Sequence, residues 1–427
     1  MRITLPSIFD DAGAPLRRRV HKLRRIISYL GPGFFVTIGF IDPGNWATNI
    51  AAGSAYNYEL LWVIVVGTLI LVLWQHMSAH LGIVKGMCMS EAIRTYMKPP
   101  AAILYGVTIM AACIATALAE ILGGALGLLL LFHIPLDLGA VLMTALVIIT
   151  LWFQGYQYLE RVIVVFVSLI GLSYLAELYL VKPDWGAAAY HTFVPHITSG
   201  NILITLGVLG AIVMPHNMYL HSEVIQNRQW AGKSERETRS LLRFEFLDTL
   251  LSMGAGMAIN MAMIMVAAAV FFRHGIHVDD LLQASATLRP IAGRLSSLIF
   301  GIALLFAGVS SSITVGIAGG TTFSGYLKKE HGTGNGLFRW GVVITLVPAL
   351  LLILVIHNTF NALIISQVCL SVQLPLTMLP LYLLTSNRRI MGDYVTGWLE
   401  NTGMIVTGVL VIGLNALLAY QLLGGKF

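Results

Sequence analysis

The sequence predicts an all-α polytopic membrane protein with two repeats of five helices followed by an eleventh helix. Hydrophobic residues make up 57% of the 427 residues and charged residues only 11%, whereas soluble domains carry roughly 25% charged residues. A helix crosses a bilayer with about 20 apolar residues, so this composition supplies about ten to twelve spans and little else. Soluble enzymes, disordered chains and proteins with a basic nucleic-acid-binding surface are therefore excluded.

Hydropathy divides the chain into eleven spans with short connections. In chain order they are expected at 28–54, 59–83, 101–130, 137–156, 161–181, 202–226, 243–272, 290–325, 338–356, 359–384 and 401–423. The resulting parts are a basic tail (1–26), a first five-helix repeat (27–181), a second repeat (182–400), and the eleventh helix with a short tail (401–427).

The distribution of basic residues predicts the orientation in the cell membrane. With the basic tail in the cytoplasm, 21 of the 26 arginines and lysines fall in inside segments and five in outside segments. Cytoplasmic loops of membrane proteins carry such an excess of positive charge. We therefore expect a multi-pass plasma-membrane protein with its N-terminus in the cytoplasm and its C-terminus outside.

Two spans contain motifs that interrupt a helix near its middle. They are Asp42-Pro43-Gly44-Asn45 in the first span and Met214-Pro215-His216-Asn217 in the sixth. Proline removes a backbone donor and clashes with the preceding turn, and free backbone at membrane depth is tolerated only around a protein-lined site. The breaks lie 172 residues apart, at matching places in consecutive five-helix blocks. This pattern predicts an inverted-repeat transporter with its substrate between two broken helices.

The residues at the breaks form a set of potential metal ligands. Asp42 is the only carboxylate in its span, and burying such a charge in a bilayer costs at least about 2.5 kcal/mol without a partner. Asn45 adds an amide oxygen and Met214 a thioether, while Pro215 cannot bond the carbonyl of Ala211 and leaves it free. A set of oxygens with one soft sulfur favours Mn²⁺, Fe²⁺ and later transition metals over Mg²⁺ and Ca²⁺.

These residues resemble the two signature motifs of the NRAMP family of divalent metal transporters. The matching segments are residues 42–48 and 210–222, and the similarity continues through 367–375 and 385–392. The resemblance implies a LeuT-like fold in which spans 1 to 5 and 6 to 10 are related as an inverted repeat. It further implies that Asp42, Asn45, Met214 and the Ala211 carbonyl bind the metal, and that Gln367 joins them in occluded states.

The sequence departs from the family where protons are usually relayed. Glu120 is present in the third span, but Ala117 replaces the usual aspartate three residues earlier, and Met110 occupies a second acidic position. In the ninth span, Gly341 and Val342 stand where the family carries paired arginines. Because these side chains cannot relay a proton, we expect proton coupling to be weak or absent.

Several other polar residues lie near the breaks or inside spans. His216, His221 and Glu120 could form an alternative proton pathway, with Arg228 as an ionic partner of Glu120. His76 and His80 share one helix face and are expected to make interhelical hydrogen bonds, because no third metal ligand lies near them in the sequence. Asp248 and Thr249 are expected to cap the start of the seventh span.

The function predicted from these observations is import of Mn²⁺ or Fe²⁺ by alternating access, with Cd²⁺ and Co²⁺ as further substrates. We expect no enzyme activity and no cofactor; the partners are the metal ion, the lipid bilayer and, where a route exists, protons. A monomer is sufficient, and nucleic acid is not a partner. Two alternatives remain open: an uncoupled Mg²⁺-capable transporter of the wider family, and a non-transporting metal sensor, for which the tails of 26 and four residues are short.

Overall fold

The computed structural model describes a helical bundle. The described residues are 42–153, 171, 174, 178–228, 230–276, 278, 280–288, 296–327 and 336–427, and all regular structure within them is helical. The predicted basic tail, the first part of the predicted first span and most of the predicted fifth span, 161–181, lie outside the described residues.

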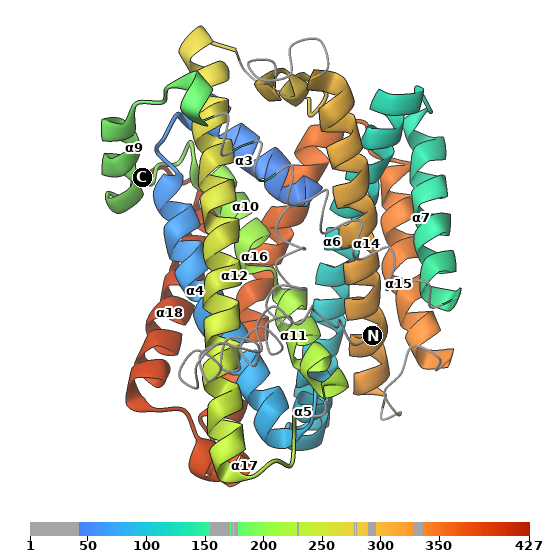
Figure 1. Cartoon of the computed structure of the whole chain (residues 1–427), viewed down its shortest axis with the longest axis vertical. Helices are drawn as coiled ribbons and strands as arrows, with labels where there is room; N and C mark the ends of the chain where they lie inside the picture. The colour runs from blue at the N-terminus through green and yellow to red at the C-terminus, as the bar shows by residue number, and fades with distance from the viewer. Residues whose placement is uncertain are drawn as a thin grey trace, which may run out of the picture.

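Nine helical segments in the described part are long and apolar enough to span a membrane, and they match nine of the eleven predicted spans (Figure 1). They are α4 (Leu61–Lys85), α6 (Pro99–Phe132), α7 (Leu136–Phe153), the pair α10 (Ile202–Val213) and α11 (Pro215–Asn227), α12 (Glu235–Val270), α14 (Ser296–Tyr326), α15 (Gly336–Ile353), α16 (Thr359–Thr385) and α18 (Trp398–Leu422). The shorter helices are α3 (Pro43–Tyr56), α5 (Met89–Tyr96), α9 (Trp185–Phe193) and α17 (Arg388–Met391).

The helix of the seventh span begins earlier than the predicted start of that span, and the cap predicted at Asp248 and Thr249 is wrong. Helix α12 begins at Glu235, eight residues before the predicted start, and Ser234 and Glu237 form a capping box there. This box satisfies the free amides of the first turn, so the helix can begin in the polar segment that precedes the apolar run. Asp248 and Thr249 therefore do not cap the helix; both are buried within it.

The predicted interruption of the sixth span is confirmed. Helix α10 ends at Val213 and α11 begins at Pro215, with Met214 between them at φ 37° and ψ 92°. In the first span, α3 begins at Pro43 with Asp42 as its N-cap. A capping aspartate followed by proline at the first helical position is a favourable helix start, so this motif places a helix terminus inside the bundle.

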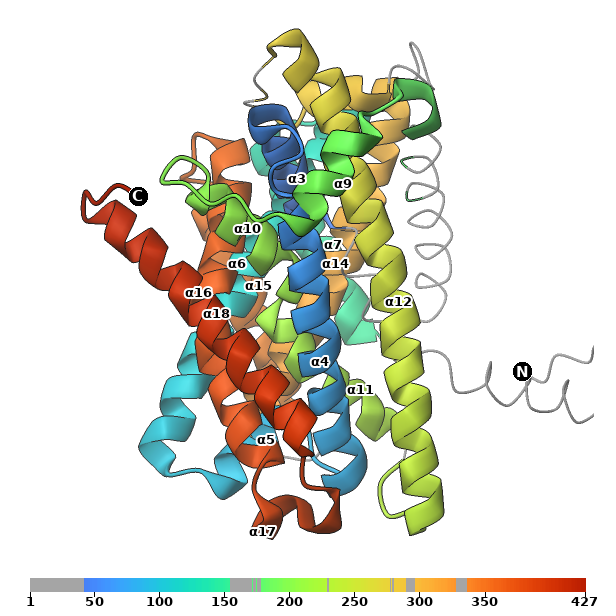
Figure 2. The same ribbon diagram turned by 90° about the vertical axis from the view of Figure 1, so that its left-hand side faces the viewer.

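Close contacts between helices place these two breaks near the centre of the bundle. In Figures 1 and 2, α4 and α12 run side by side, and α18 lies at one edge. Gly123 of α6 faces the ring of Pro43, and a side chain at that position would collide with it. Gly210 of α10 packs in the same way against the backbone of α16 at Gln367. The elements α3, α6, α10 and α16 are thus held close together at the breaks.

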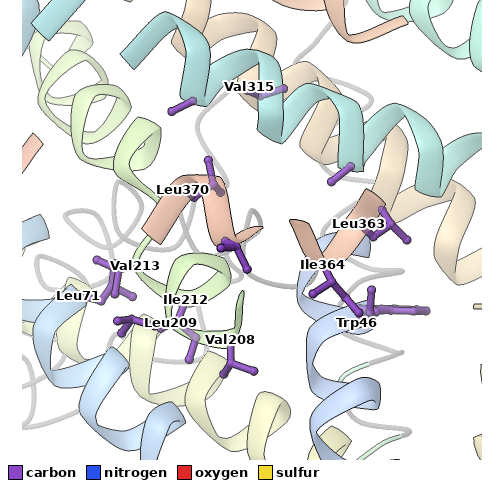
Figure 3. Close-up of a cluster of buried hydrophobic side chains, with 14 of the residues drawn as sticks. Trp46, Leu71, Val208, Leu209, Ile212, Val213, Val315, Leu363, Ile364 and Leu370 are labelled. Carbon is purple, nitrogen blue, oxygen red and sulfur yellow. The ribbon is translucent and has the colours of Figure 1, made fainter. Parts of the chain in front are cut away.

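A cluster of buried apolar side chains involves the helices that meet at the breaks (Figure 3). Trp46 of α3, Ile212 of α10 and Ile364 of α16 belong to one large cluster of buried hydrophobic residues. In such an apolar setting, electrostatic interactions are stronger than in water, and an unpaired polar group is costly. The polar groups at the breaks are therefore expected to serve a site.

Candidate functional site

The start of α3 forms the first half of the candidate site. Asp42 is fully buried. One of its carboxylate oxygens, Oδ1, accepts a hydrogen bond from the backbone N–H of Asn45 at 2.7 Å, and Oδ2 accepts one from the Asn45 side-chain amide, also at 2.7 Å. Asp42 and Asn45, which are three residues apart in the sequence, therefore meet at the start of α3 in the geometry of an N-cap.

A hydrogen bond from Asn45 joins the two breaks. The same amide nitrogen of Asn45 donates to the carbonyl of Ala211 at 3.0 Å. Within a continuous helix this carbonyl would accept from residue 215, but Pro215 has no N–H to donate. The freed carbonyl of α10 therefore points to α3, and Asn45 holds it close to the Asp42 carboxylate.

Met214 occupies the junction between α10 and α11 and is buried. Its φ of 37° is unfavourable for a residue with a side chain, and such strain persists only where the surrounding structure enforces it. The side-chain amide of Asn217 donates to the Met214 sulfur at 3.2 Å, which orients the thioether. Sequence reasoning missed this role of Asn217, although Asn217 lies three residues along the same motif.

Gln367 reaches the same place from α16. Its side-chain amide lies directly against Gly44, where an added Cβ would collide with the amide and stand 3.1 Å from Asp42 Oδ1. The Gln367 nitrogen donates to Ser366 at 3.2 Å. All five predicted metal-binding positions, Asp42, Asn45, Ala211, Met214 and Gln367, are therefore buried at the meeting point of α3, α10, α11 and α16.

The donor chemistry of this cluster suits a cation. The side-chain oxygens of Asn45, Asn217 and Gln367 are buried and accept no hydrogen bond from any described residue. A buried acceptor without a donor is costly, and a cation would satisfy several of them together. The described residues contain no group of three histidines, cysteines or carboxylates able to hold a metal, so an ion bound here would rely on a mixed set of oxygen and sulfur.

Glu120 and His216 lie on the α6 side of the site. Glu120 is buried beside Ser311 of α14 and interacts electrostatically with Asp42. The Thr116 hydroxyl donates to the Ala112 carbonyl at 3.1 Å and contacts Nδ1 of His216 at 3.2 Å. Thr116 therefore connects the backbone of α6 to the imidazole of His216 in α11.

His221 belongs to a separate polar network farther along α11. Its Nδ1 is 2.8 Å from Gln75 Oε1, and its Nε2 is 3.8 Å from Glu245 of α12. Glu245 also contacts His76, which confirms the interhelical hydrogen bond predicted for that histidine. Sequence reasoning missed Glu245, although an acidic residue inside a predicted span was a visible signal.

The structure does not bring Arg228 to Glu120. Arg228 is exposed after the last turn of α11, whereas Glu120 is buried in α6, and no ion pair joins these two described residues. The prediction of this ion pair is wrong. It failed because polarity in the sequence does not reveal which way a residue at a helix end points.

Three of the four positions that depart from the family are tightly packed, whereas Met110 is half-buried. Ala117 and Val342 are fully buried. A side chain at Gly341 would stand 2.8 Å from the Cα of Gly320 and from the Cβ of Phe323, both in α14. The contact between α14 and α15 is thus built around glycine, and it leaves no space at position 341 for a long cationic side chain.

The fold and the buried site define a class of polytopic membrane protein with a LeuT-like architecture. The solved structure of Mhp1, a nucleobase-cation-symport-1 family transporter, matches the fold with a TM-score of 0.60 at 15% identity, covering 91% of this chain and 93% of that one. The predicted fold class, an inverted five-plus-five repeat with an eleventh helix, is confirmed by this likeness and by the one that follows.

The chain belongs to the Nramp family. The model of the natural resistance-associated macrophage protein-like family matches residues 33–421. A relative from Caldanaerobacter subterraneus subsp. tengcongensis, named divalent metal cation transporter MntH, is 38% identical over 408 residues, covering 95% of this chain and 96% of the relative. The solved structure of a manganese transporter from Eremococcus coleocola matches with a TM-score of 0.79 at 26% identity, covering 96% of this chain and 88% of that chain. These relatives are named as transporters, in agreement with the prediction that the chain is not an enzyme.

Proposed function

We propose that this protein imports divalent transition-metal ions, Mn²⁺ and Fe²⁺ first, across the plasma membrane by alternating access. The site for the ion consists of Asp42, Asn45, the Ala211 carbonyl and Met214, with Gln367 closing it from α16. The N-terminus lies in the cytoplasm and the C-terminus outside. Transport is weakly coupled to protons or uncoupled.

The observation that carries the proposal is the direct link between the two helix breaks. The Asn45 amide bonds the Asp42 carboxylate and the Ala211 carbonyl at the same time, at 2.7 Å and 3.0 Å. An N–H donor between two oxygens occupies the position that a cation takes when it binds both. Rotation of the Asn45 side-chain amide exchanges the positions of its nitrogen and its oxygen. The oxygen, Oδ1, then becomes a third ligand beside the Asp42 carboxylate and the Ala211 carbonyl.

Met214 supports a transition metal as the substrate. Its sulfur is held at the junction by Asn217, in the same buried region as the oxygens. Mg²⁺ and Ca²⁺ prefer oxygen ligands, whereas a thioether binds softer ions. This donor set therefore opposes the alternative of a Mg²⁺ transporter.

The burial of the site supports alternating access. All five positions are shielded from solvent, so an ion can enter or leave only when helices move. The contact between Gly210 and the α16 backbone is close, and a shift of α16 against α10 would separate Gln367 from the other ligands. Such movement of one helix group against another around a central site is typical of repeat-built transporters.

The packing around Ala117 and Gly341 supports weak or absent proton coupling. The usual relay needs titratable groups within hydrogen-bond reach of each other. Ala117 is buried in apolar surroundings, and Gly341 lies against the backbone of α14. His216 and Glu120 are the titratable groups that remain on the α6 side, and they would carry any residual coupling.

Uptake into proteoliposomes that contain an internal pH dye tests the proposal. The protein should import Mn²⁺ while the internal pH stays constant, and excess Mg²⁺ should not compete. Asp42→Ala should abolish uptake because it removes the only charge among the ligands. Met214→Ala should retain much of the Mn²⁺ uptake but admit Mg²⁺ or Ca²⁺.

Each part of the proposal has an outcome that would contradict it. Full Mn²⁺ uptake by Asp42→Ala would exclude this site, and unchanged selectivity in Met214→Ala would exclude the role of the sulfur. Acidification in strict proportion to Mn²⁺ entry would show that protons travel by another route. Metal binding without any transport by the wild-type protein would favour the alternative of a sensor.

A further inference from the structure

A groove of about 820 Å³ is lined by residues of α5, α6, α14 and α15, and none of the five candidate metal-binding positions lines it. It runs along the first half of α6 and is closed by the end of α14 and by α15. Most of its lining is apolar, including Ala102, Val107, Ala111, Phe323 and Ile344, and Arg94 of α5 lies at one end. Figure 1 shows α5 at the lower end of the molecule.

The length of α6 places the groove at the level of one bilayer leaflet. Its 34 residues make a helix of about 51 Å, longer than the hydrocarbon core of about 30 Å. The groove follows α6 from Pro99 to Ile114, a rise of about 22 Å. With the excess length of α6 shared between its two ends, about 10 Å of the groove lies at the level of the headgroups and about 12 Å lies within a leaflet whose hydrocarbon depth is about 15 Å.

The walls of the groove are open to the surface of the bundle. Ile103 is 66% exposed and Val107 is 64% exposed, and both line it. In a membrane-spanning helix, such side chains contact lipid. The groove therefore opens to hydrocarbon rather than to an aqueous path.

The basic end of the groove has an unused hydrogen-bond donor. The Nε of Arg94 donates to the Gly325 carbonyl at 3.1 Å, which fixes the guanidinium at the end of α14. Its Nη1 is buried and has no hydrogen-bond partner among the described residues. Lys98, at the N-cap of α6, is exposed nearby, and the positive end of that helix dipole adds to the local field.

We propose that this groove binds an anionic phospholipid. One acyl chain lies along α6 between Ala111 and Phe323, and the headgroup phosphate accepts hydrogen bonds from the guanidinium of Arg94, which lines the groove. Lys98 contributes a second positive charge. A lipid phosphate presents the negative oxygens that a guanidinium binds best, and the apolar walls match the chain attached to it. A neutral amphiphile without a phosphate would leave the Arg94 guanidinium without an anionic acceptor. Phosphatidylcholine has the phosphate, but its quaternary ammonium offsets that charge, so it gains less from Arg94 and Lys98 than a lipid with a net negative charge.

Native mass spectrometry of the purified protein tests this assignment with defined lipids. Phosphatidylglycerol and phosphatidylcholine with identical acyl chains are titrated separately, and the lipid-bound fractions are compared. The wild-type protein should retain one phosphatidylglycerol in preference to phosphatidylcholine. Arg94→Gln should weaken that binding about fivefold, equivalent to the loss of about 1 kcal/mol for one basic residue at an anionic surface.

Two further variants separate the groove from general charge effects. Ala111→Trp fills the groove from an exposed position and should remove specific retention of both lipids. Arg389→Gln removes an exposed arginine of α17, also at the lower end of the molecule in Figure 1, and should bind lipid like the wild-type protein.

Three results would overturn the assignment. Wild-type phosphatidylglycerol binding by both Arg94→Gln and Ala111→Trp would place the lipid elsewhere. Equal weakening by Arg389→Gln would show that only net charge matters. A lipid-free dimer that disappears in Ala111→Trp would assign the groove to a second copy of the chain.

Discussion

Replacing Gly210 with alanine tests whether the contact between α10 and α16 sets the geometry of the proposed metal site. The added Cβ would collide with the Gln367 carbonyl oxygen and stand 2.8 Å from the backbone nitrogen of Ser371. Carbon atoms pack at about 3.5 Å or more, so α16 must move by at least about 0.7 Å. Both obstacles are backbone atoms, which a change of rotamer cannot relieve.

This displacement moves Gln367 away from the ligands of α3 and strains the break at Met214. A misplacement of about 1 Å in a functional site can lower a rate by about 100-fold, and overpacking of this kind costs about 1–3 kcal/mol of stability. We expect Mn²⁺ uptake by Gly210→Ala to fall at least about tenfold, equivalent to about 1.4 kcal/mol, with a lower melting temperature in detergent.

Gly207→Ala is the matched control, one turn earlier on the same helix. Its Cβ would stand 3.3 Å from Thr48 Cγ2 and 3.6 Å from the next two side chains, on Ile364 and Val368. These are side-chain contacts that small shifts relieve, so uptake should remain within about twofold of the wild-type rate, a difference of less than about 0.5 kcal/mol. Normal uptake by Gly210→Ala, or an equal loss in both variants, would refute the proposed role of the Gly210 contact.

Two more substitutions test single contacts. Asn217→Ala removes the amide that orients the Met214 sulfur and should weaken Mn²⁺ binding about tenfold by calorimetry, as the loss of a supporting hydrogen bond to a ligand does; unchanged affinity would contradict that role. Ala117→Asp places an acidic group in α6. The new carboxylate has no arginine partner at position 341, because that position is a glycine packed against α14. Its Mn²⁺ uptake should stay uncoupled from the internal pH and its melting temperature should fall, whereas metal-dependent acidification would show that one carboxylate completes a relay.

The break between α10 and α11 and the start of α3 at Pro43 could be predicted from the sequence because their causes are local. Proline lacks an N–H wherever it stands, so Pro215 frees the Ala211 carbonyl whatever the surrounding fold. The structure adds the acceptor's partner, Asn45, which lies 166 residues away in sequence. The metal-binding role of Asp42, Asn45, Ala211 and Met214 is a prediction drawn from residue types and from the family resemblance.

The contacts that depend on tertiary packing could not be predicted. Glu245 and His221 meet only because α12 and α11 both lie beside α4, and no periodicity encodes that meeting. The wrong prediction of an ion pair between Glu120 and Arg228 has the same cause. Both residues are charged, but Glu120 is buried and Arg228 is exposed. Apolar spans specify burial well, but they leave the orientation of each helix to side-chain packing.

The Asn45 amide also suggests how the site selects its ion. In the proposed function, an entering ion must replace the Asn45 hydrogen bonds to Asp42 and to Ala211 and shed its own water. The bond to the neutral carbonyl contributes about 1 kcal/mol and the bond to the carboxylate about 1.5–3 kcal/mol. A divalent ion beside a buried carboxylate regains more than these bonds supply, because attraction between opposite charges is strong where the dielectric constant is low. Mg²⁺ loses water reluctantly and gains little from the Met214 sulfur, whereas Mn²⁺ and Fe²⁺ accept a mixed oxygen and sulfur set. If the proposed function is correct, selectivity would follow from the cost of dehydration set against the softness of one ligand, and the Asn45 amide would close the site until a suitable ion arrives.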